Sequence, residues 1–532
     1  MFANQPKGLI PAALSNMGER FGYYIMNAVL VLFLCSKFGL AEEQSTIIYS
    51  CFYAGIYLLS LVGGVIADKT RNYKGTIASG LIIMTFGYAV LAIPILSTSD
   101  NIGWLLPMTC VALFLIAFGN GLFKGNLQAL VGQLYDNPRY SASRDSGFQI
   151  FYVFINIGGL IAPFVAPMLR SWWLGVHNLS YNAQLPELCH KYLSVTGNMN
   201  QQDADNLMDL ISQTGGSVTA GEHEAISAFC TQYLEVFNTG IHYSFIASVA
   251  AMLISLVIFL MSKKMLPTPA KKEAASKSVR ISDAERRAMA GEIRQRLYAL
   301  LAVLAVVIFF WFSFHQNGTS LSLFARDFCV TDTIAPEIWQ AVNPFFVIVL
   351  TPVIMLLFSA LSNRGIEIST PRKIAIGMGL AAIAYLFLAI FSSIMDYPSA
   401  NLFKELPVGE AASLKAGPWV LIVLYFFLTV AELFISPLGL SFVSKVAPSH
   451  MQGLCQGLWL GATAVGNLLL PLGPLMYNNW SLWICWGVFM LVCVISMGVM
   501  FSMVRWLERV TSDKVEAEVA AEPIKSEEEG VI

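Results

Sequence analysis

Twelve segments of the chain are apolar over about 20 residues or more, the length that a helix needs to cross a hydrocarbon core about 30 Å thick. Only 12% of the 532 residues are charged, whereas a soluble domain carries about 25%. Backbone polar groups find no water inside a bilayer, so such segments fold as helices. The sequence therefore predicts an all-α integral membrane protein with twelve transmembrane helices, at approximately 14–36, 46–67, 75–97, 104–130, 148–172, 241–262, 297–324, 339–361, 373–394, 417–443, 453–477 and 481–505.

Lys and Arg gather in alternate loops, and cytoplasmic loops are the ones that carry such an excess. Segment 263–296 alone holds ten of them. We therefore expect both termini in the cytoplasm and two six-helix bundles, 1–264 and 297–508. Between the bundles, 265–296 is expected to be a cytoplasmic linker with an amphipathic helix on the membrane surface. Residues 509–532 read as an acidic, solvent-facing cytoplasmic tail.

Residues 173–240 form an insertion on the exported side of the first bundle, with helix-like pieces near 203–212 and 222–237. Cys189 and Cys230 are its close pair of cysteines. In an oxidising compartment they could form a disulfide, and the alternative is two free thiols. The cysteines of the apolar segments lack the spacing of metal ligands, so we expect neither a metal nor a cofactor. No basic block suggests nucleic acid.

Away from the span ends, ionisable side chains stand inside only four of the twelve spans: Glu19 and Arg20 in the first, Lys124 in the fourth, His315 in the seventh and Glu432 in the tenth. A charge at membrane depth costs about 2.5–3.5 kcal/mol on insertion scales, so it needs a polar cavity or a partner. These four spans begin successive three-helix units, and 3+3 repeats place corresponding helices around a midplane site. The pattern predicts one shared cavity. The alternative is that the first pair lies at the membrane surface.

Several motifs resemble those of a known family. The stretch from Gly63 to Arg71 is similar to the signature loop of the major facilitator superfamily, in which the glycines allow close helix approach and the charges lock helix ends. The gating residues implied here are Gly63, Gly64, Asp68 and Arg71. Further motifs look like the proton-dependent oligopeptide transporter family: 19–24 (ERFGYY), 151–158 (FYVFINIG), 343–344 (NP), 370–373 (TPRK), and 432 with 436–441 (E, SPLGLS).

This resemblance covers nearly all twelve spans but not the insertion or the tail. It implies a major facilitator fold of 3+3 repeats, in which two bundles alternate access to a central site. The implied activity is proton-driven import of di- and tripeptides across a bacterial inner membrane, by a multi-pass protein that functions as a monomer in the lipid bilayer. Small peptides and protons are the implied partners.

A short peptide is a zwitterion, and burying it requires an anion, a cation and neutral groups that read amides. Glu432 suits the ammonium. Arg20 and Lys124 suit the carboxylate. Asn156 and Asn343 can donate to and accept from peptide amides. The alternative for the two asparagines is hydrogen bonding between helices.

The remaining predicted site residues follow from the resemblance. Substrate-binding positions also include Tyr23, Tyr24, Tyr57, Trp311, Ser436 and Trp459. Proton coupling is implied for Glu19, Arg20, Lys124, His315 and Glu432. Some of the aromatic residues, such as Tyr23 and Trp311, could instead serve packing alone.

Three residues depart from the family pattern: Asn16, Asn27 and His315 replace a Glu, an Arg and an acidic residue. Because these three positions belong to the charged network of the family, the proton route that the family implies does not carry over unchanged to this chain. A free imidazole titrates near pH ~6.5, so His315 could be neutral in one cavity state and protonated in the other. The alternative is that it only hydrogen-bonds across helices.

The leading hypothesis is a proton-coupled peptide importer. One alternative is a transporter of another small substrate, such as an amino-acid derivative, with altered or absent proton coupling, because a fold does not fix a substrate. A membrane receptor on a transporter scaffold is a further alternative. An enzyme is not expected, because no span carries a nucleophile–base pair or a ligand cluster.

Overall fold

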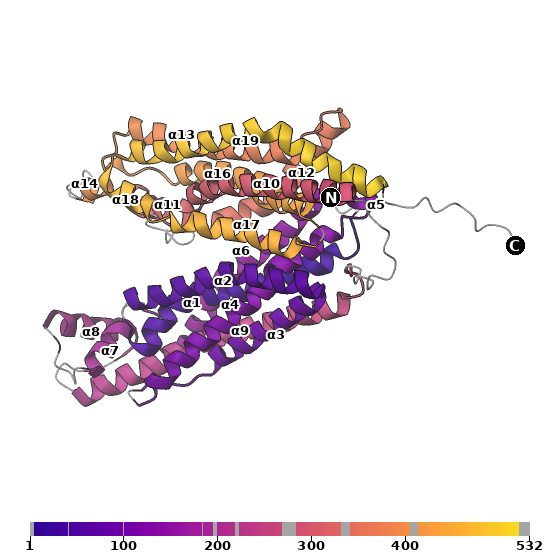
Figure 1. Cartoon of the computed structure of the whole chain (residues 1–532). Helices are drawn as coiled ribbons and strands as arrows, with labels where there is room; N and C mark the ends of the chain where they lie inside the picture. The colour runs from indigo at the N-terminus through magenta and orange to yellow at the C-terminus, as the bar shows by residue number, and fades with distance from the viewer. Residues whose placement is uncertain are drawn as a thin grey trace.

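A computed structural model describes residues 5–40, 42–98, 100–182, 185–194, 199, 201–216, 218, 223–268, 283–330, 341–404, 413–448 and 450–520. Two helical bundles make up this part of the chain (Figure 1). Within the described ranges, eleven helices are long and apolar enough to cross a membrane, and the first helix makes a twelfth span although it bends by 43° near residue 28. The all-α, twelve-span prediction is confirmed.

The N-terminal bundle contains six spans and the short α5. They are α1 (Leu9–Phe38), α2 (Glu42–Thr70), α3 (Tyr73–Ala92), α4 (Ile102–Gln133), α5 (Pro138–Ser141), α6 (Arg144–Val176) and α9 (His223–Ser262). Within it α1 packs on α6 and α9, and α4 packs on α2 and α3. Glycines allow the closest approach: a Cβ on Gly63 of α2 would lie 2.1 Å from the carbonyl oxygen of Gly121 in α4.

The C-terminal bundle contains the other six spans, two of them broken. Its elements are α10 (Asp283–Phe314), η1 (His315–Gly318), α11 (Ser320–Phe328), α12 (Val342–Asn363), α13 (Thr370–Ile394), α14 (Ala400–Lys404), α16 (Trp419–Val446), α17 (Gln452–Leu468), α18 (Leu472–Asn479) and α19 (Leu482–Ala520). The seventh span, expected as one helix over 297–324, changes to a 3₁₀ turn at His315. Asn317 and Gly318 are poor helix formers, which accounts for the break.

Two expected segments merge into longer helices. The linker helix is not a separate surface element: α10 runs without a break from Asp283 into the seventh span, while 269–282 lie outside the described residues. The start of the acidic tail is helical, because α19 continues to Ala520. No Gly or Pro stands between Gly498 and Pro523 to end that helix earlier. Residues 521–532 lie outside the described residues.

The insertion adds α7 (Leu185–Ser194) and α8 (Gln201–Gln213) at the end of the molecule opposite the termini (Figure 1). Its second predicted helix is the beginning of α9. His190 fastens α7 to the first span, with Nε2 2.6 Å from the carbonyl oxygen of Ser36, and burial lowers the His190 pKa. Cys189 and Cys230 are buried, and a hydrogen bond between them together with burial raises the pKa of the Cys189 thiol. A disulfide between them stays a prediction.

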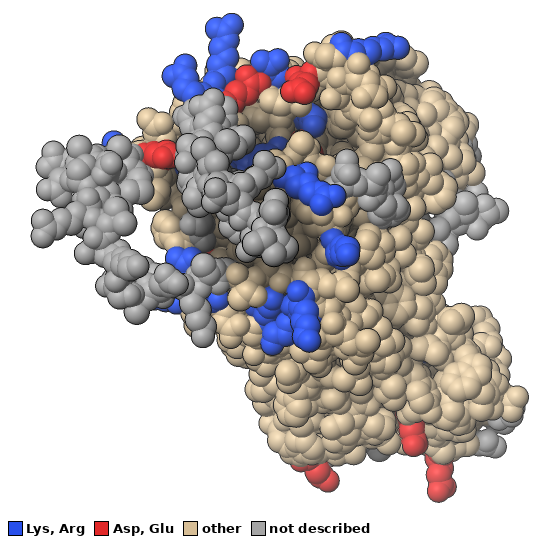
Figure 2. All heavy atoms as spheres, turned by 90° about the vertical axis from the view of Figure 1, so that its right-hand side faces the viewer, with Lys and Arg blue, Asp and Glu red and all other residues tan. Residues whose placement is uncertain are grey.

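Lys and Arg gather on the face of the molecule near the N-terminus (Figure 2). Exposed basic side chains from the predicted cytoplasmic loops and helix ends include Lys69, Arg139, Arg364, Arg372 and Arg505. Since basic residues concentrate on the cytoplasmic side of membrane proteins, we infer that this face, with the start of α1 and the end of α19, is cytoplasmic. That the insertion lies on the exported side follows from this orientation and stays a prediction.

Candidate functional site

Glu19 and Arg20 form a buried ion pair in the N-terminal bundle, with side chains 0% and 6% exposed. Arg20 donates from Nε and Nη2 to the two Glu19 carboxylate oxygens, each at 2.6 Å. Asn120 of α4 donates from Nδ2 to Glu19 Oε1, also at 2.6 Å. The pair is therefore enclosed between helices rather than lying at the membrane surface. Sequence reasoning missed Asn120, although it stands one helical turn before Lys124.

Lys124 lies beside this pair on α4 and is partly buried. Its Nζ is 5.1 Å from the centre of the Tyr57 ring, a cation–π contact. Among the described residues, no carboxylate lies within ion-pair distance of Lys124. Arg20 makes a similar contact with Tyr23, 4.7 Å from guanidinium carbon to ring centre. The two cations thus differ, because Arg20 is neutralised by its neighbour and Lys124 is not.

Glu432 is the buried carboxylate of the C-terminal bundle, on α16 and 5% exposed. Asn343 of α12 donates from Nδ2 to its Oε2 at 2.7 Å, and to the Thr429 hydroxyl at 3.1 Å. Tyr152 of α6 donates its hydroxyl to Oε1. Tyr152 belongs to the other bundle, so this hydrogen bond joins the two halves of the molecule. Ser436 is buried one turn after Glu432.

The FYVFINIG motif explains how α6 contacts both the helix of the Glu19–Arg20 pair and the Glu432 carboxylate. Asn156 stands one turn after Tyr152 and donates from Nδ2 to its carbonyl oxygen at 3.0 Å. Gly158 allows α6 to touch α1, because a Cβ there would lie 2.8 Å from the carbonyl oxygen of Met17. The motif therefore sets α6 against the helix that carries Glu19 while it presents Tyr152 to Glu432.

His315 lies in the 3₁₀ turn that breaks the seventh span. Its Nδ1 hydrogen-bonds Oδ1 of Asn467 in α17, and its ring stacks on Trp311 with centres 4.9 Å apart. Its hydrogen-bonding partner is therefore a neutral amide rather than one of the predicted charged residues. In this conformation the geometry favours the alternative of hydrogen bonding across helices.

The predicted aromatic residues fall into two groups. Trp459 is 3% exposed and packs on Gly439, where a Cβ would lie 1.9 Å from the indole ring. Trp311 and Tyr23 are also buried. Tyr24 and Tyr57 are only partly buried. The last two are thus the more accessible of the five.

On the cytoplasmic side, two sets of contacts join the bundles. The first is made by Asp68 at the end of α2. Its carboxylate accepts from the backbone N–H groups of Gly453 at 3.0 Å and Leu454 at 2.8 Å, at the start of α17. A carboxylate at a helix N-terminus is favoured by the helix dipole. Gly64 faces the same contact, because a Cβ there would lie 2.5 Å from the carbonyl oxygen of Gly453. Arg71, the fourth predicted gating residue, takes a left-handed conformation with φ 54° just after α2.

The second set of cytoplasmic contacts between the bundles centres on Asp145 in the first turn of α6. Lys373 and Lys445 of the C-terminal bundle pair with its carboxylate at 2.9 and 2.6 Å, and Ser441 donates to it at 2.6 Å. Arg144 donates from Nη1 to the Ser444 hydroxyl at 2.9 Å. Sequence reasoning missed this cluster because its charges stand at span ends. The bundles approach each other here and diverge toward the exported end in Figure 1.

Two six-helix bundles fastened at one membrane face, with buried charges on facing helices, define a major-facilitator type of membrane transporter. The model of the POT family, PTR2, matches residues 74–189 and 268–481. The chain belongs to the POT family. It is thus a transporter and not an enzyme.

Relatives and solved structures agree with this assignment. "Dipeptide and tripeptide permease B" of Xenorhabdus bovienii is 27% identical over 544 residues, which cover 97% of this chain and 98% of the relative. "Peptide transporter YePEPT" of Yersinia enterocolitica is 28% identical over 486 residues, covering 88% and 87%. A mutant peptide transporter POT solved with alafosfalin is 21% identical, with TM-score 0.57 and 96% of each chain covered. A POT family transporter solved with 5-aminolevulinic acid is 18% identical, with TM-score 0.56 and coverage of 96% and 98%.

Proposed function

We propose that the protein imports di- and tripeptides across the bacterial inner membrane by symport with protons. One observation carries the proposal: facing bundles hold a buried carboxylate, Glu432, and a cation without a carboxylate partner, Lys124. This pair is what the two ends of a peptide need. The names of the bacterial relatives, dipeptide and tripeptide permeases, support the substrate class.

Glu432 binds the peptide ammonium, and Lys124 binds the peptide carboxylate. Tyr152 and Asn343 hold both oxygens of Glu432 until the ammonium arrives, so they keep the buried charge solvated. Asn156 and Asn343 read the peptide amides. Of the aromatic residues, Tyr24 and Tyr57 are best placed by exposure to meet peptide side chains.

Glu19 and Arg20 supply the coupling step in this proposal. While Glu19 is ionised, it occupies two donor groups of Arg20. A proton on Glu19 removes its negative charge and weakens both bonds, because charge-assisted hydrogen bonds are about twice as strong as neutral ones. Arg20 then becomes available as a second partner for the peptide carboxylate. Proton uptake and peptide binding thus favour each other.

In this conformation the two bundles are in contact on the cytoplasmic side. We therefore interpret it as the outward-facing state. Transport then requires the Asp68 and Asp145 contacts to open while the exported ends close. Gly64 belongs to the same interface, since it touches the backbone of the opposite bundle.

Gly64→Ala should weaken the outward-facing state, because its Cβ would meet the Gly453 carbonyl oxygen at 2.5 Å. Cys455 of α17 is 0% exposed and provides a natural reporter. We expect maleimide to label Cys455 about tenfold faster in the variant, as read by mass spectrometry of the Cys455 peptide. Gly461→Ala is the matched control, because a Cβ there meets nothing within 4 Å. An unchanged labelling rate in Gly64→Ala would count against this gate.

His315→Gln tests whether the imidazole takes part in coupling. Gln keeps a donor for Asn467 but cannot titrate. If His315 must be protonated during transport, acidifying the exported side stimulates the wild type between about pH 7.5 and 5.5, and the variant loses that stimulation. The control is His177→Gln at the exported end of α6. An unchanged pH profile with full accumulation would assign His315 to hydrogen bonding alone.

A second candidate is transport of another small zwitterion. It is favoured by the similar structure solved with 5-aminolevulinic acid and by the replacement of family charges at Asn16, Asn27 and His315. Uptake of a labelled dipeptide into proteoliposomes, in competition with unlabelled tripeptide or 5-aminolevulinic acid, separates the two. Competition by the tripeptide supports a peptide importer. Competition by the amino acid alone supports the second candidate.

A further inference from the structure

Lys37 is a buried cation outside the proposed peptide site. It lies in the last turn of α1, 5% exposed, and about 25 Å along the helix from Arg20 at 1.5 Å per residue. Among the described residues it forms no ion pair with a carboxylate. Burying a charge without a counter-charge is costly, so the surroundings of Lys37 need an explanation.

The polar partner of Lys37 is His242 of α9, with Nζ 3.3 Å from Nε2. His242 Nδ1 lies 2.8 Å from the carbonyl oxygen of Leu91. Nδ1 therefore carries the hydrogen and donates to Leu91, and Nε2 accepts from Lys37. The imidazole is neutral in this arrangement, so it uses one ammonium N–H and supplies no negative charge.

Among the residues whose side chains the structure describes, the other neighbours of Lys37 supply no negative charge either. The rings of Phe33 and Phe38 lie 5.0 and 5.8 Å from Nζ, at cation–π distance. Ser36 and Asn238 satisfy each other, because the Ser36 hydroxyl donates to Asn238 Oδ1 at 2.8 Å and Asn238 Nδ2 donates to the Ser36 carbonyl at 3.0 Å. In the described part of the chain, two of the three ammonium hydrogens thus have no acceptor.

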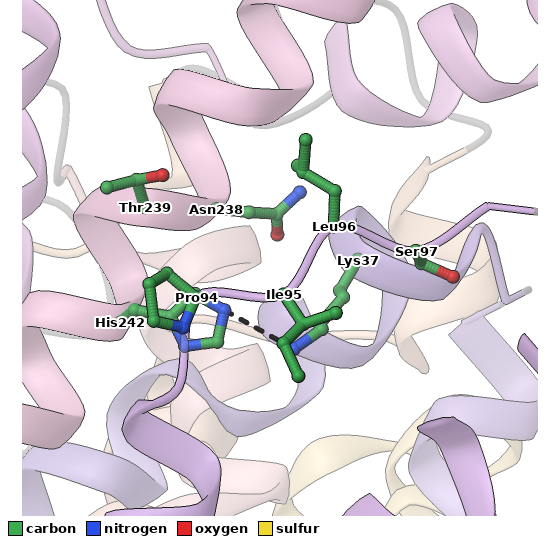
Figure 3. Close-up of a pocket in the computed structure, with 8 residues that line it drawn as sticks. All are labelled: Lys37, Pro94, Ile95, Leu96, Ser97, Asn238, Thr239 and His242. Atoms are coloured by element: carbon green, nitrogen blue, oxygen red, sulfur yellow. Dashed lines mark hydrogen bonds between the residues drawn. The ribbon is translucent and has the colours of Figure 1, made fainter. Parts of the chain in front are cut away.

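A small, partly open pocket adjoins these groups (Figure 3). Its lining residues are Lys37, Pro94, Ile95, Leu96, Ser97, Asn238, Thr239 and His242. None of them is acidic, and Ser97 and Thr239 carry hydroxyl groups. The lining segments are the exported end of α1, the chain just after α3, and α9.

We propose that this pocket binds a small monovalent inorganic anion, such as chloride, as the counter-charge of Lys37. The anion would accept from the free ammonium hydrogens and would bridge α1, the segment after α3 and α9. A monovalent ion such as chloride suits the lining because its charged group is a single cation, Lys37. The inference does not depend on the peptide proposal, because it concerns other residues at the exported end of one bundle.

The test measures thermal unfolding of the purified full-length protein while chloride or bromide replaces gluconate at constant ionic strength. We expect a saturable rise in Tm of about 2–5 °C for the wild type. Lys37→Met keeps much of the apolar stem but removes the charge, so it should lose the rise. Lys191→Met is the control, since Lys191 is exposed and pairs with Asp203. The absence of a halide-specific rise in the wild type, or an equal rise in Lys37→Met, would overturn the proposal.

Bromide diffraction keeps the proposal testable if Lys37→Met does not fold. Crystals of the wild type grown in bromide should show an anomalous peak beside Lys37 Nζ. Density without an anomalous signal at that position, as for a water molecule, would overturn the assignment.

Discussion

Glu432→Gln should lower the affinity for free dipeptides by about 100- to 1,000-fold or more, because removing one partner of a buried charge pair costs about 3–5 kcal/mol and each 1.4 kcal/mol is tenfold. Gln preserves the size of the side chain and can still bond Tyr152 and Asn343. The loss is thus mainly that of the negative charge. N-acetylated dipeptides carry no ammonium and should lose less than about threefold. Competition against a labelled dipeptide in proteoliposomes measures the affinities for the free and for the N-acetylated dipeptides.

The matched control is Glu508→Gln, the same substitution at an exposed ion pair with Arg372 on the cytoplasmic side. It should bind both ligands as the wild type does. Equal weakening of free and acetylated dipeptides by Glu432→Gln would remove Glu432 from the ammonium site.

Lys124→Ala should abolish gradient-driven accumulation, because Lys124 is the central cation without a carboxylate partner in the described structure. Arg20 is held by Glu19 and cannot replace it while Glu19 is ionised. Some exchange between internal and external peptide should persist if Lys124 serves mainly coupling. Accumulation and exchange in the same proteoliposomes measure the two effects.

Two further variants control the Lys124 experiment. Lys124→Arg keeps the charge and should retain part of the accumulation. Lys264→Ala removes an exposed cytoplasmic lysine and should accumulate peptide normally. Full accumulation by Lys124→Ala would refute the assignment.

The fold could be predicted because bilayer chemistry acts on each segment separately. Length and apolarity mark a span without reference to its neighbours, so all twelve spans were found from sequence. Helix ends were less predictable. The insertion helix merges into α9 and the linker helix into α10, because no Pro stands in the intervening residues to end either helix.

The composition of the central site could be predicted, but its pairing could not. Buried charge inside apolar spans singled out Glu19, Arg20, Lys124 and Glu432 from sequence. The partner of each charged side chain depends on how the helices pack against each other. The hydrophobic pattern of the sequence does not contain that information. The partners Asn120 and Tyr152 were therefore missed, as was the neutralisation of Arg20 by the residue before it.

Charges near span ends were the weakest point of the sequence reasoning. Lys37, Asp145 and His242 stand where a surface position is the default expectation, yet Lys37 and His242 are buried within the N-terminal bundle. Asp145 instead joins the two bundles. Only the packing of the helices distinguishes these cases.

Accumulation of a labelled dipeptide in proteoliposomes containing the wild-type protein tests the central claim most directly. With an inward proton gradient, we predict an internal concentration above the external one, which a protonophore collapses to equality. Without a gradient, uptake should stop at equal concentrations. A dipeptide level that is the same with and without the gradient would contradict proton symport, and no uptake of any di- or tripeptide by the folded protein would contradict peptide import.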